Sequence, residues 1–266
     1  MEFEAITIND LDDIRNLQPQ DWSDIIPDFK FYIKSSYCHP IKTKIKDQIV
    51  GIGTSIVFEN TSWIAHVIVH SEYRNKGIGA QFVSKLLDTM KKDSIATCSL
   101  IATDLGMPVY LKAGFKKVAQ YSFFQREKQW IDRPVSGNVV SFNEQYCAMI
   151  YELDHSISGE KRELLLADYL INSKVYVENN KVLGYYIPGL KEGLIFADND
   201  EAGLELMKLK YASVDKAVLP SDNHAGIEFL QQNGFVETKK GTRMILGKDL
   251  DWNPKKMFSR IGGNLG

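Results

Sequence analysis

The sequence predicts an α/β (α+β) protein made of two copies of one domain, and three observations support this prediction. An apolar strand over 67–69 passes through a short, glycine-containing loop into an amphipathic helix that begins at Ile78. Strand-like runs joined by short polar turns precede that strand, a pattern typical of an antiparallel meander. Features of the first 126 residues then return in the second half of the chain.

Each element of the first half has a local signal. Asn9-Asp10 can cap a helix, Lys46-Asp47-Gln48 marks a hairpin turn, and Gly114 stands where a helix end favours a left-handed residue. Lys91 and Lys92 close the helix that begins at Ile78, where cations suit the negative end of the helix dipole. The expected elements, in chain order, are a strand at 3–8, a helix from Leu11, one or two helices within 22–36, strands at 41–45, 50–58 and 62–69, a helix from Ile78 through Met90, a strand at 94–102, a short helix with Pro108 in its first turn, and a strand at 115–124.

The loop before Ile78 is a candidate anion site. Gly77 and Gly79 lack a Cβ atom, so a ligand can approach the backbone closely. The first N–H groups of a helix have no partner within the helix and carry partial positive charge, and Arg74 and Lys76 add full charges. Such a site suits phosphate or pyrophosphate. The Walker pattern and the third glycine of a dinucleotide fingerprint are both absent.

Two motifs carry a resemblance to a known family. The run Arg74-Asn75-Lys76-Gly77-Ile78-Gly79 looks like the acetyl-CoA pyrophosphate loop of the GCN5-related N-acetyltransferases (GNAT). About 30 residues later, the run Thr103-x-x-Gly106-x-Pro108-x-Tyr110-x-x-x-Gly114-Phe115 resembles the same superfamily. The resemblance implies a mixed, mostly antiparallel twisted sheet flanked by helices. It also implies transfer of an acetyl group from acetyl-CoA to an amine.

The resemblance further implies roles for individual residues. In the family the pantetheine arm of acetyl-CoA runs along the third meander strand like an added strand. Tyr110 matches the family's proton donor to the coenzyme A thiolate, and the alternative is a tyrosine that only packs on the sheet. The expected acetyl-CoA-binding residues are Val67, Val69, Arg74, Asn75, Lys76, Gly77, Ile78, Gly79 and Ala80.

The general base stays open at this stage. Family bases often lie about nine or eleven residues before the position of Arg74, where this chain has Ala65 and Trp63. His66 is one residue away, so strand alternation turns it to the other face unless a bulge restores it. A water relay, a residue near Asp28 or a residue of the second copy are equally open.

The second copy departs from the first at the candidate site. Lys181 to Tyr185 mirrors Gln48 to Ile52, and Phe229 to Phe235 mirrors Val109 to Phe115. The copy is 13 residues shorter between these marks, and acids replace the basic loop in a helix expected to begin near Phe196. A resemblance to the C-terminal half of bacterial tandem acetyltransferases is carried by Tyr151-Glu152-Leu153-Asp154, Gly159-x-Lys161-Arg162 and Arg243-Met244-Ile245-Leu246-Gly247. We expect an acetyltransferase domain at 1–126, a linker at 127–145 and a degenerate, non-catalytic domain at 146–266 that forms part of the acceptor groove or a dimer contact. The segment 252–266 is expected to be an irregular tail packed on this domain.

Composition narrows the setting of the protein. The 266 residues carry a net charge of −2, which gives no reason to expect a nucleic acid partner. No run of 18 apolar residues predicts a membrane span, and the acidic N-terminus lacks the pattern of a signal peptide. Cys38, Cys98 and Cys147 suit a reducing compartment and, like the histidines, show no metal-ligand spacing. We therefore expect a cytoplasmic protein without a metal.

The sequence thus predicts an N-acetyltransferase that acts by direct attack of an amine on acetyl-CoA in a ternary complex. Two alternatives are a transferase of longer acyl groups and an acyl-CoA-binding module without turnover. The acceptor is a small-molecule or peptide amine, and polyamine, aminoglycoside, amino acid and peptide N-terminus all stay open. A homodimer is possible.

Overall fold

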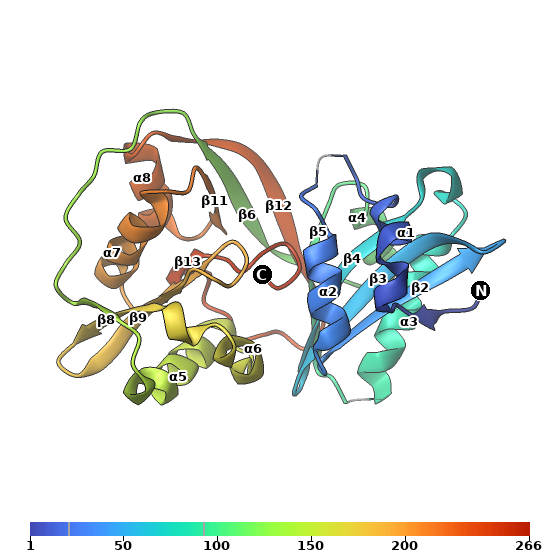
Figure 1. Ribbon diagram of the computed structural model, residues 1–266, viewed down its shortest axis with the longest axis horizontal. Coiled ribbons are helices and arrows are strands. Elements are labelled where there is room, and N and C mark those ends of the chain that lie inside the picture. Colours follow the sequence, from blue (N-terminus) through green and yellow to red (C-terminus); the bar gives the residue numbers. More distant parts are fainter. Residues whose placement is uncertain (21, 93) are drawn as a thin grey trace. The chain divides into compact units, whose positions relative to one another are not determined.

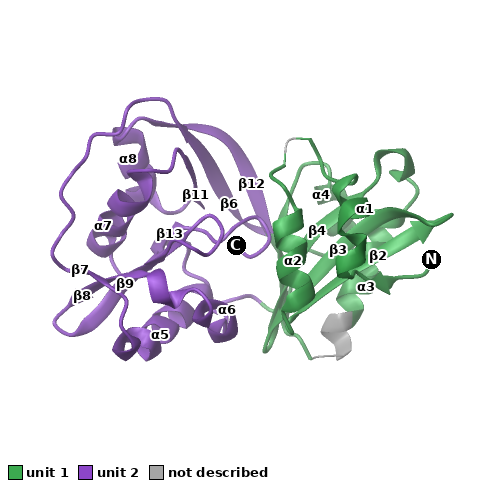
Figure 2. Ribbon diagram, viewed as in Figure 1, with its two compact units in different colours: residues 1–116, 244–248 green, residues 117–243, 249–266 purple. Residues whose placement is uncertain are grey.

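The computed structural model describes residues 1–20, 22–92 and 94–266, without the side chains of 89–92. The expected roles of Met90, Lys91 and Lys92 therefore lie outside the described residues. The chain forms two compact units (Figure 2). Unit 1 comprises Met1–Lys116 and Met244–Lys248, and unit 2 comprises Lys117–Arg243 and Asp249–Gly266. The boundaries 1–126, 127–145 and 146–266 describe duplicated copies rather than compact units, and they remain our proposal for the copies.

Unit 1 contains the elements expected from the sequence up to the short helix before Gly114, with shifts at their ends. The strand expected at 115–124 is present as β6 (Lys116–Arg126), but all of it except Lys116 belongs to unit 2. The short helix before Gly114 begins at Met107, after a turn in which Gly106 N donates to the Thr103 hydroxyl at 3.2 Å. The elements are β1 (Glu4–Ala5), α1 (Leu11–Arg15), α2 (Ile26–Lys34), β2 (Cys38–Ile45), β3 (Gln48–Phe58), β4 (Thr61–Val69), α3 (Ile78–Lys92), β5 (Thr97–Ala102) and α4 (Met107–Lys112).

The sheet of unit 1 is a meander extended by two further strands. Its strands lie in the order β1-β2-β3-β4-β5-β12, and neighbours from β1 to β4 are antiparallel, whereas β4 and β5 are parallel. Lys46 and Asp47 join β2 to β3 with φ angles of 49° and 65°. Positive φ at both central residues is typical of the tight turn whose twist matches an antiparallel pair. The predicted hairpin is therefore present.

The last strand of unit 1 comes from the far end of the chain. β12 (Phe235–Gly247) ends beside β5, where Lys248 N donates to the carbonyl oxygen of Ala96 at 3.0 Å. The Thr97 hydroxyl donates to the carbonyl oxygen of Lys248 at 2.8 Å. Met244 is fully buried in a cluster with Cys98 and Leu100. Apolar burial and backbone pairing thus both fasten this segment to unit 1.

Helices cover both faces of the sheet in unit 1. A Cβ atom on Gly53 would lie 3.1 Å from Leu86 and 3.2 Å from Phe82, so this face of β3 meets α3. Residues of β4 on the other face meet α2, where Phe29 and Tyr32 are fully buried. Strand alternation assigns each side chain of β3 and β4 to one of these two helices.

Unit 2 holds most of the second copy, which repeats the element order of the first copy (Figure 1). Two helices precede a three-stranded meander, which is followed by a helix, a strand, a helix and a long strand. The elements are β6 (Lys116–Arg126), β7 (Val139–Ser141), α5 (Cys147–Ser158), α6 (Glu163–Ala167), β8 (Lys174–Glu178), β9 (Lys181–Ile187), β10 (Leu194–Ala197), α7 (Asp200–Tyr211), β11 (Lys216–Pro220), α8 (His224–Gln232), β12 and β13 (Met257–Ser259).

Three expectations for unit 2 need correction. The linker at 127–145 contains β7, which pairs with β8. Phe196 belongs to β10, and the next helix begins at Asp200. The segment 252–266 does pack into unit 2, where Phe258, Ile261 and Leu265 are fully buried, but it is not irregular throughout. β13 joins the sheet antiparallel to β10, giving the order β13-β10-β9-β8-β7.

A buried ion pair ties α5 to the segment that follows it. Arg162 donates to both carboxylate oxygens of Asp154, at 2.6 and 3.0 Å, and both residues are at most 2% exposed. The Tyr185 hydroxyl donates to Asp154 at 2.5 Å, and Glu160 lies 3.9 Å from Arg162. Burial opposes the charge of Arg162, but the Asp154 carboxylate outweighs burial and raises the pKa of Arg162.

Lys210 of α7 is a buried cation whose charge is costly. It is 2% exposed and donates to the carbonyl oxygen of Gly193 at 3.1 Å and to the Ser259 hydroxyl. Burial lowers the pKa of Lys210 from 10.5 to about 8, although the charge of Glu192 acts in the opposite direction. The free energy of unfolding therefore depends on pH, because Lys210 binds a proton less tightly in the folded chain than in the unfolded chain.

We expect the stability of unit 2 to rise with pH because of Lys210. Between pH 8 and 10.5 the unfolded chain binds the proton that the folded chain has released, so alkali favours the folded state. The expected gain is about 2 kcal/mol between pH 7.5 and 9.5. Unfolding in denaturant across this range should give a smaller slope for Lys210→Met than for the exposed control Lys255→Met. Equal slopes would contradict the assignment.

Candidate functional site

β4 has an open edge in unit 1. Its pairing with β5 covers only Thr61–Thr97, Ser62–Cys98 and Trp63–Ser99, although β4 continues to Val69 and β5 to Ala102. On its other side β4 stays paired with β3 as far as Val69. Over 64–69, no strand of the described residues pairs with the outer edge of β4, where the Val69 carbonyl oxygen accepts from the side chain of Arg74. A strand edge of this kind accepts an extended chain by backbone hydrogen bonding.

Val67 and Val69 lie on this open edge. Their side chains are half-buried and pack toward α3, beside the cluster of Val50, Ile78 and Phe82. Their backbones are the parts that an added ligand would meet. The side chains of Val67 and Val69 can thus pack in the core while their backbones bind a ligand.

The loop that follows β4 ends at the N-terminus of α3. Asn75 and Gly77 have φ angles of 60° and 81°, and the first helical hydrogen bond runs from Gln81 N to the carbonyl oxygen of Gly77, at 3.1 Å. The N–H groups of Ile78, Gly79 and Ala80 precede that bond and have no partner within the helix. They form the positive end of a helix of 15 residues.

Side chains around the loop divide into exposed and buried groups. Arg74 is exposed and its Nε donates to the carbonyl oxygen of Val69 at 3.1 Å, while Lys76 lies over the Tyr73 ring at 4.9 Å. Asn75 and Ala80 are exposed as well. Ile78 is 3% exposed, so only its backbone can reach a ligand. The loop brings two cations and a row of N–H groups to one end of α3.

Tyr110 lies on α4, near the end of β5. It is half-buried, with its ring 5.8 Å from that of Phe115 in an edge-to-face contact. Burial, and to a lesser degree the charge of the Cys98 thiolate, raises the pKa of Tyr110 to about 12. The phenol therefore keeps its proton throughout the physiological range and is able to donate a hydrogen bond.

His66 stands at a β-bulge. The pairing of β3 with β4 shifts between Ile52–Ile68 and Thr54–Ala65, so His66 and Val67 together oppose Gly53. His66 has a φ of 50°, which is unusual for a residue with a Cβ atom. The bulge turns its imidazole to the face covered by α2, the face of Ala65. Simple alternation would have turned it away, so this is the exception that the sequence left open.

The imidazole contacts a carboxylate and a phenol. His66 Nδ1 lies 2.9 Å from the Tyr32 hydroxyl, and His66 Nε2 lies 3.4 Å from Asp28 Oδ2. The rings of Trp22 and Phe29 lie 5.8 and 5.6 Å from the imidazole. Sequence patterns pointed to the vicinity of Asp28, but the contribution of Tyr32 was missed because only the fold brings α2 and the bulge together.

The corresponding edge in unit 2 is filled. β10 takes the place of β4 in the repeated element order, and β13 pairs along it. The helix that follows is capped by its own Asn199, whose side chain accepts from Ala202 N at 2.9 Å, and its first turn carries Asp200 and Glu201. The expected acids are present, and neither an open edge nor a basic loop is found at this place.

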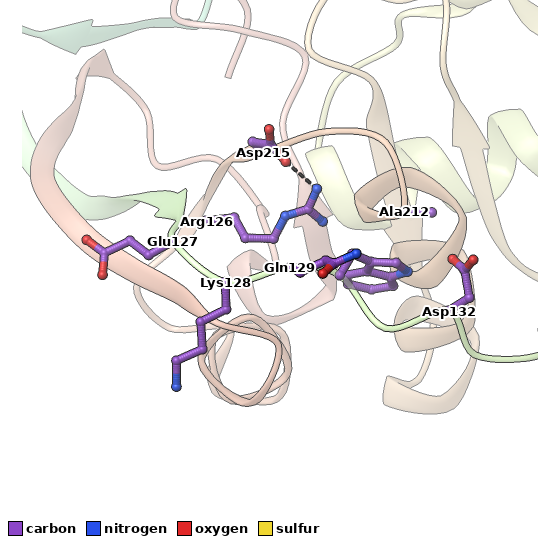
Figure 3. A pocket seen from close by; sticks show the side chains of 8 residues that line it. Arg126, Glu127, Lys128, Gln129, Asp132, Ala212 and Asp215 are labelled. Carbon is purple, nitrogen blue, oxygen red and sulfur yellow. Dashed lines mark hydrogen bonds and ion pairs between the residues drawn. The ribbon is translucent and has the colours of Figure 1, made fainter.

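A separate pocket of about 440 Å³ lies within unit 2 (Figure 3). Arg126 forms an ion pair with Asp215 and donates to the carbonyl oxygen of Tyr211 at 2.5 Å. Its guanidinium also lies 5.6 Å from the Trp130 ring. The lining contains none of the predicted site residues and consists of Arg126, Glu127, Lys128, Gln129, Trp130, Asp132, Ala212 and Asp215. Charges of both signs give it no preference for one class of ligand.

Two family models match this chain. Models described as acetyltransferase (GNAT) domain match residues 10–131 and 150–259. The chain belongs to the GNAT acetyltransferase family. It carries two GNAT domains in tandem, as the sequence motifs predicted, and members of this family use acetyl-CoA to acylate amines. No curated protein matches the chain at a significant level.

Solved structures share this GNAT fold over nearly the whole chain. A putative acetyltransferase from Pyrococcus horikoshii is 18% identical, with a TM-score of 0.83 over 100% of this chain and 95% of that one. A GCN5-related N-acetyltransferase from Sphaerobacter thermophilus is 12% identical, with a TM-score of 0.64 over 95% and 98%. A tandem GNAT protein from the clavulanic acid biosynthesis pathway is 13% identical, with a TM-score of 0.61 over 92% and 98%. These likenesses concern the fold.

Within the described residues, no three or more His, Cys, Asp or Glu side chains gather in a way that could hold a metal ion. None of the described helices combines the length and apolar character needed to cross a bilayer.

Proposed function

We propose that this GNAT protein is an N-acetyltransferase with one active site, in unit 1, that transfers the acetyl group of acetyl-CoA to a primary amine. The observation that carries the proposal is the open edge of β4, which leads directly into the basic loop at the N-terminus of α3. An extended pantetheine arm needs the first feature, and the pyrophosphate at its end needs the second.

In this proposal the backbone of β4 holds the arm beside Val67 and Val69. The N–H groups of Gly77 to Ala80 bind the pyrophosphate, and Arg74 and Lys76 add charge. A backbone N–H of β4 stabilises the oxyanion of the tetrahedral intermediate. The amine nitrogen attacks the thioester carbon in a ternary complex, because no covalent enzyme intermediate is required.

Tyr110 is the proposed proton donor to the departing thiolate. Its hydroxyl approaches sulfur as the C–S bond breaks, passes its proton to sulfur and regains one from water. Because the pKa of Tyr110 is raised, the group is always protonated when needed. Its hydrogen bond stabilises the negative charge that develops on sulfur in the transition state.

Release of free coenzyme A tests the proposed reaction. The purified protein is incubated with acetyl-CoA and a panel of polyamines, aminoglycosides, amino acids and peptides. Amine-dependent release of thiol supports the proposal. Tight binding of acetyl-CoA without release for any amine would favour the module without turnover, and faster release from longer acyl-CoAs would favour a different acyl group.

Tyr110→Phe should slow turnover about 10- to 100-fold with little change in acetyl-CoA affinity, because the substitution removes a donor and keeps the ring. Steady-state kinetics and calorimetric titration with acetyl-CoA check the two parts separately. The half-buried Tyr146→Phe in unit 2 is the matched control and should retain full turnover. Full turnover of Tyr110→Phe would remove its assigned role.

A further inference from the structure

The bulge in β4 presents an imidazole where the proposed reaction needs a base. We infer that His66 is the general base that deprotonates the acceptor amine, and that Tyr32 and Asp28 are positioning residues that orient and stabilise its ring. The inference rests on the proposed acetyl transfer and extends it, because the sequence left the base unassigned at Ala65 and Trp63.

The backbone at His66 is strained in a way that serves this placement. A φ of 50° is unfavourable for a residue with a Cβ atom. The bulge lies within 64–69, the half of β4 whose outer edge is open. A strand without the bulge would place the imidazole toward α3, away from Asp28. The strained backbone conformation therefore brings the His66 side chain to the α2 face, beside the open edge of β4.

The contacts of the ring assign its two nitrogens. An ammonium group bound beside Asp28 favours the tautomer in which Nδ1–H donates to the Tyr32 oxygen, 2.9 Å away, because the Nε2 lone pair then faces the cation and not the bare carboxylate. Nε2 lies 3.4 Å from Asp28 Oδ2. The Asp28 side chain is 27% exposed, whereas that of His66 is 10% exposed and Tyr32 is fully buried. An incoming cation therefore reaches the Asp28 side of the imidazole and not the Tyr32 side.

The surroundings select a cationic amine. Asp28 attracts an ammonium group, and the ring of Trp22 offers an aromatic edge close to the imidazole. Among the described residues, the titratable groups in contact with His66 are Asp28 and Tyr32, both on α2, while Gly53 and Thr54 across the bulge carry none. The carboxylate stabilises the imidazolium that forms when the ammonium loses its proton.

The proton balance is complete with these groups. The ammonium R–NH₃⁺ gives one proton to His66 Nε2, and the nitrogen lone pair then forms a C–N bond to the thioester carbon. The C–S bond breaks and its electron pair leaves on sulfur, which receives the proton of Tyr110. The nitrogen loses a second proton to water, which reprotonates Tyr110. His66 returns its proton to solvent, so each turnover yields the amide, free thiol and one proton.

Packing alone offers a simpler account of His66, since three aromatic rings surround it. His66→Phe keeps the bulk and the ring contacts but cannot accept a proton. We expect kcat/KM for the amine to fall about 100-fold, with unchanged acetyl-CoA affinity and unchanged thermal unfolding. The wild-type decline of kcat/KM at acid pH should disappear in the variant. His66→Ala should regain part of its turnover when imidazole is added, which a purely structural role would not allow.

The positioning residues have separate signatures. Tyr32→Phe should lower kcat several-fold, because the tautomer with a free Nε2 is no longer favoured. Asp28→Asn should raise KM for the amine, because the ammonium group loses the carboxylate that attracts it. His224→Gln, an exposed histidine of unit 2, is the control and should match the wild type.

The outcomes separate this inference from the proposed function. If the wild-type protein releases coenzyme A and His66→Phe does so equally well with the same acid limb, His66 is not the base. If the wild-type protein releases none with any amine, the acetyl transfer itself is wrong. An acid limb that vanishes in His66→Phe, with rescue of His66→Ala by imidazole, establishes the base.

Discussion

Gly79→Glu should abolish coenzyme A binding while the fold is kept. A Cβ atom at Gly79 would meet only Val69, at an ordinary contact distance of 3.9 Å, so the helix has room for a side chain. The carboxylate would stand among N–H groups proposed to hold the pyrophosphate, where two like charges repel. We expect the dissociation constant for coenzyme A to rise at least about 100-fold, as measured by calorimetric titration.

Gly79 is a better probe than Gly77. Gly77 has a φ of 81°, so any side chain there strains the backbone and confuses loss of binding with local misfolding. Gly79→Gln separates bulk from charge and should bind coenzyme A more tightly than Gly79→Glu. Gly137→Glu adds the same charge at an open glycine of unit 2 and should bind normally. Normal binding by Gly79→Glu would mean that the pyrophosphate lies elsewhere.

Arg162→Met should be the most destabilising single substitution that we predict. Asp154 and Glu160 would remain in a dry interior without the guanidinium that offsets their charge. Breaking a buried pair by removing one partner costs about 3–5 kcal/mol. Unfolding in urea, followed by the fluorescence of the tryptophans, should show this loss of stability.

A surface ion pair is the control for Arg162→Met. Lys256 lies 2.6 Å from Asp198, and the two side chains are 34% and 49% exposed. Lys256→Met should therefore cost less than about 1 kcal/mol. Adding Asp154→Asn to Arg162→Met should recover part of the loss, because one of the stranded charges is removed. A loss as small as that of Lys256→Met would show that solvent reaches the Arg162 network.

Local signals explain what could be predicted from the sequence. The hairpin at Lys46-Asp47, the helix that begins at Ile78 and the left-handed Gly114 and Gly234 each depend on a few neighbouring residues. The duplication was visible because whole runs recur in the same order. The two GNAT domains and the type of fold followed from these signals together with the two motifs.

Long-range pairing explains what could not be predicted. Nothing near Met257 marks it as a partner for β10, and nothing near Met244 marks it as a core residue of unit 1. The bulge at His66 arises because β3 and β4 differ by one residue in register, and that difference is a property of the pair of strands. The cluster of His66, Asp28 and Tyr32 depends on the bulge, so it could not be predicted from the sequence for the same reason.

The route of β12 has a consequence for how the molecule is made. Residues 244–248 are synthesised long after β5, yet they supply the strand beside it. Until then the leading half of the nascent chain has an unprotected strand and an unfilled place at Met244, which invites aggregation or capture by a chaperone. A gene fragment that stops at the end of the first copy would keep that defect permanently. The two halves are copies by descent, but they are not interchangeable modules that can be expressed or recombined one at a time.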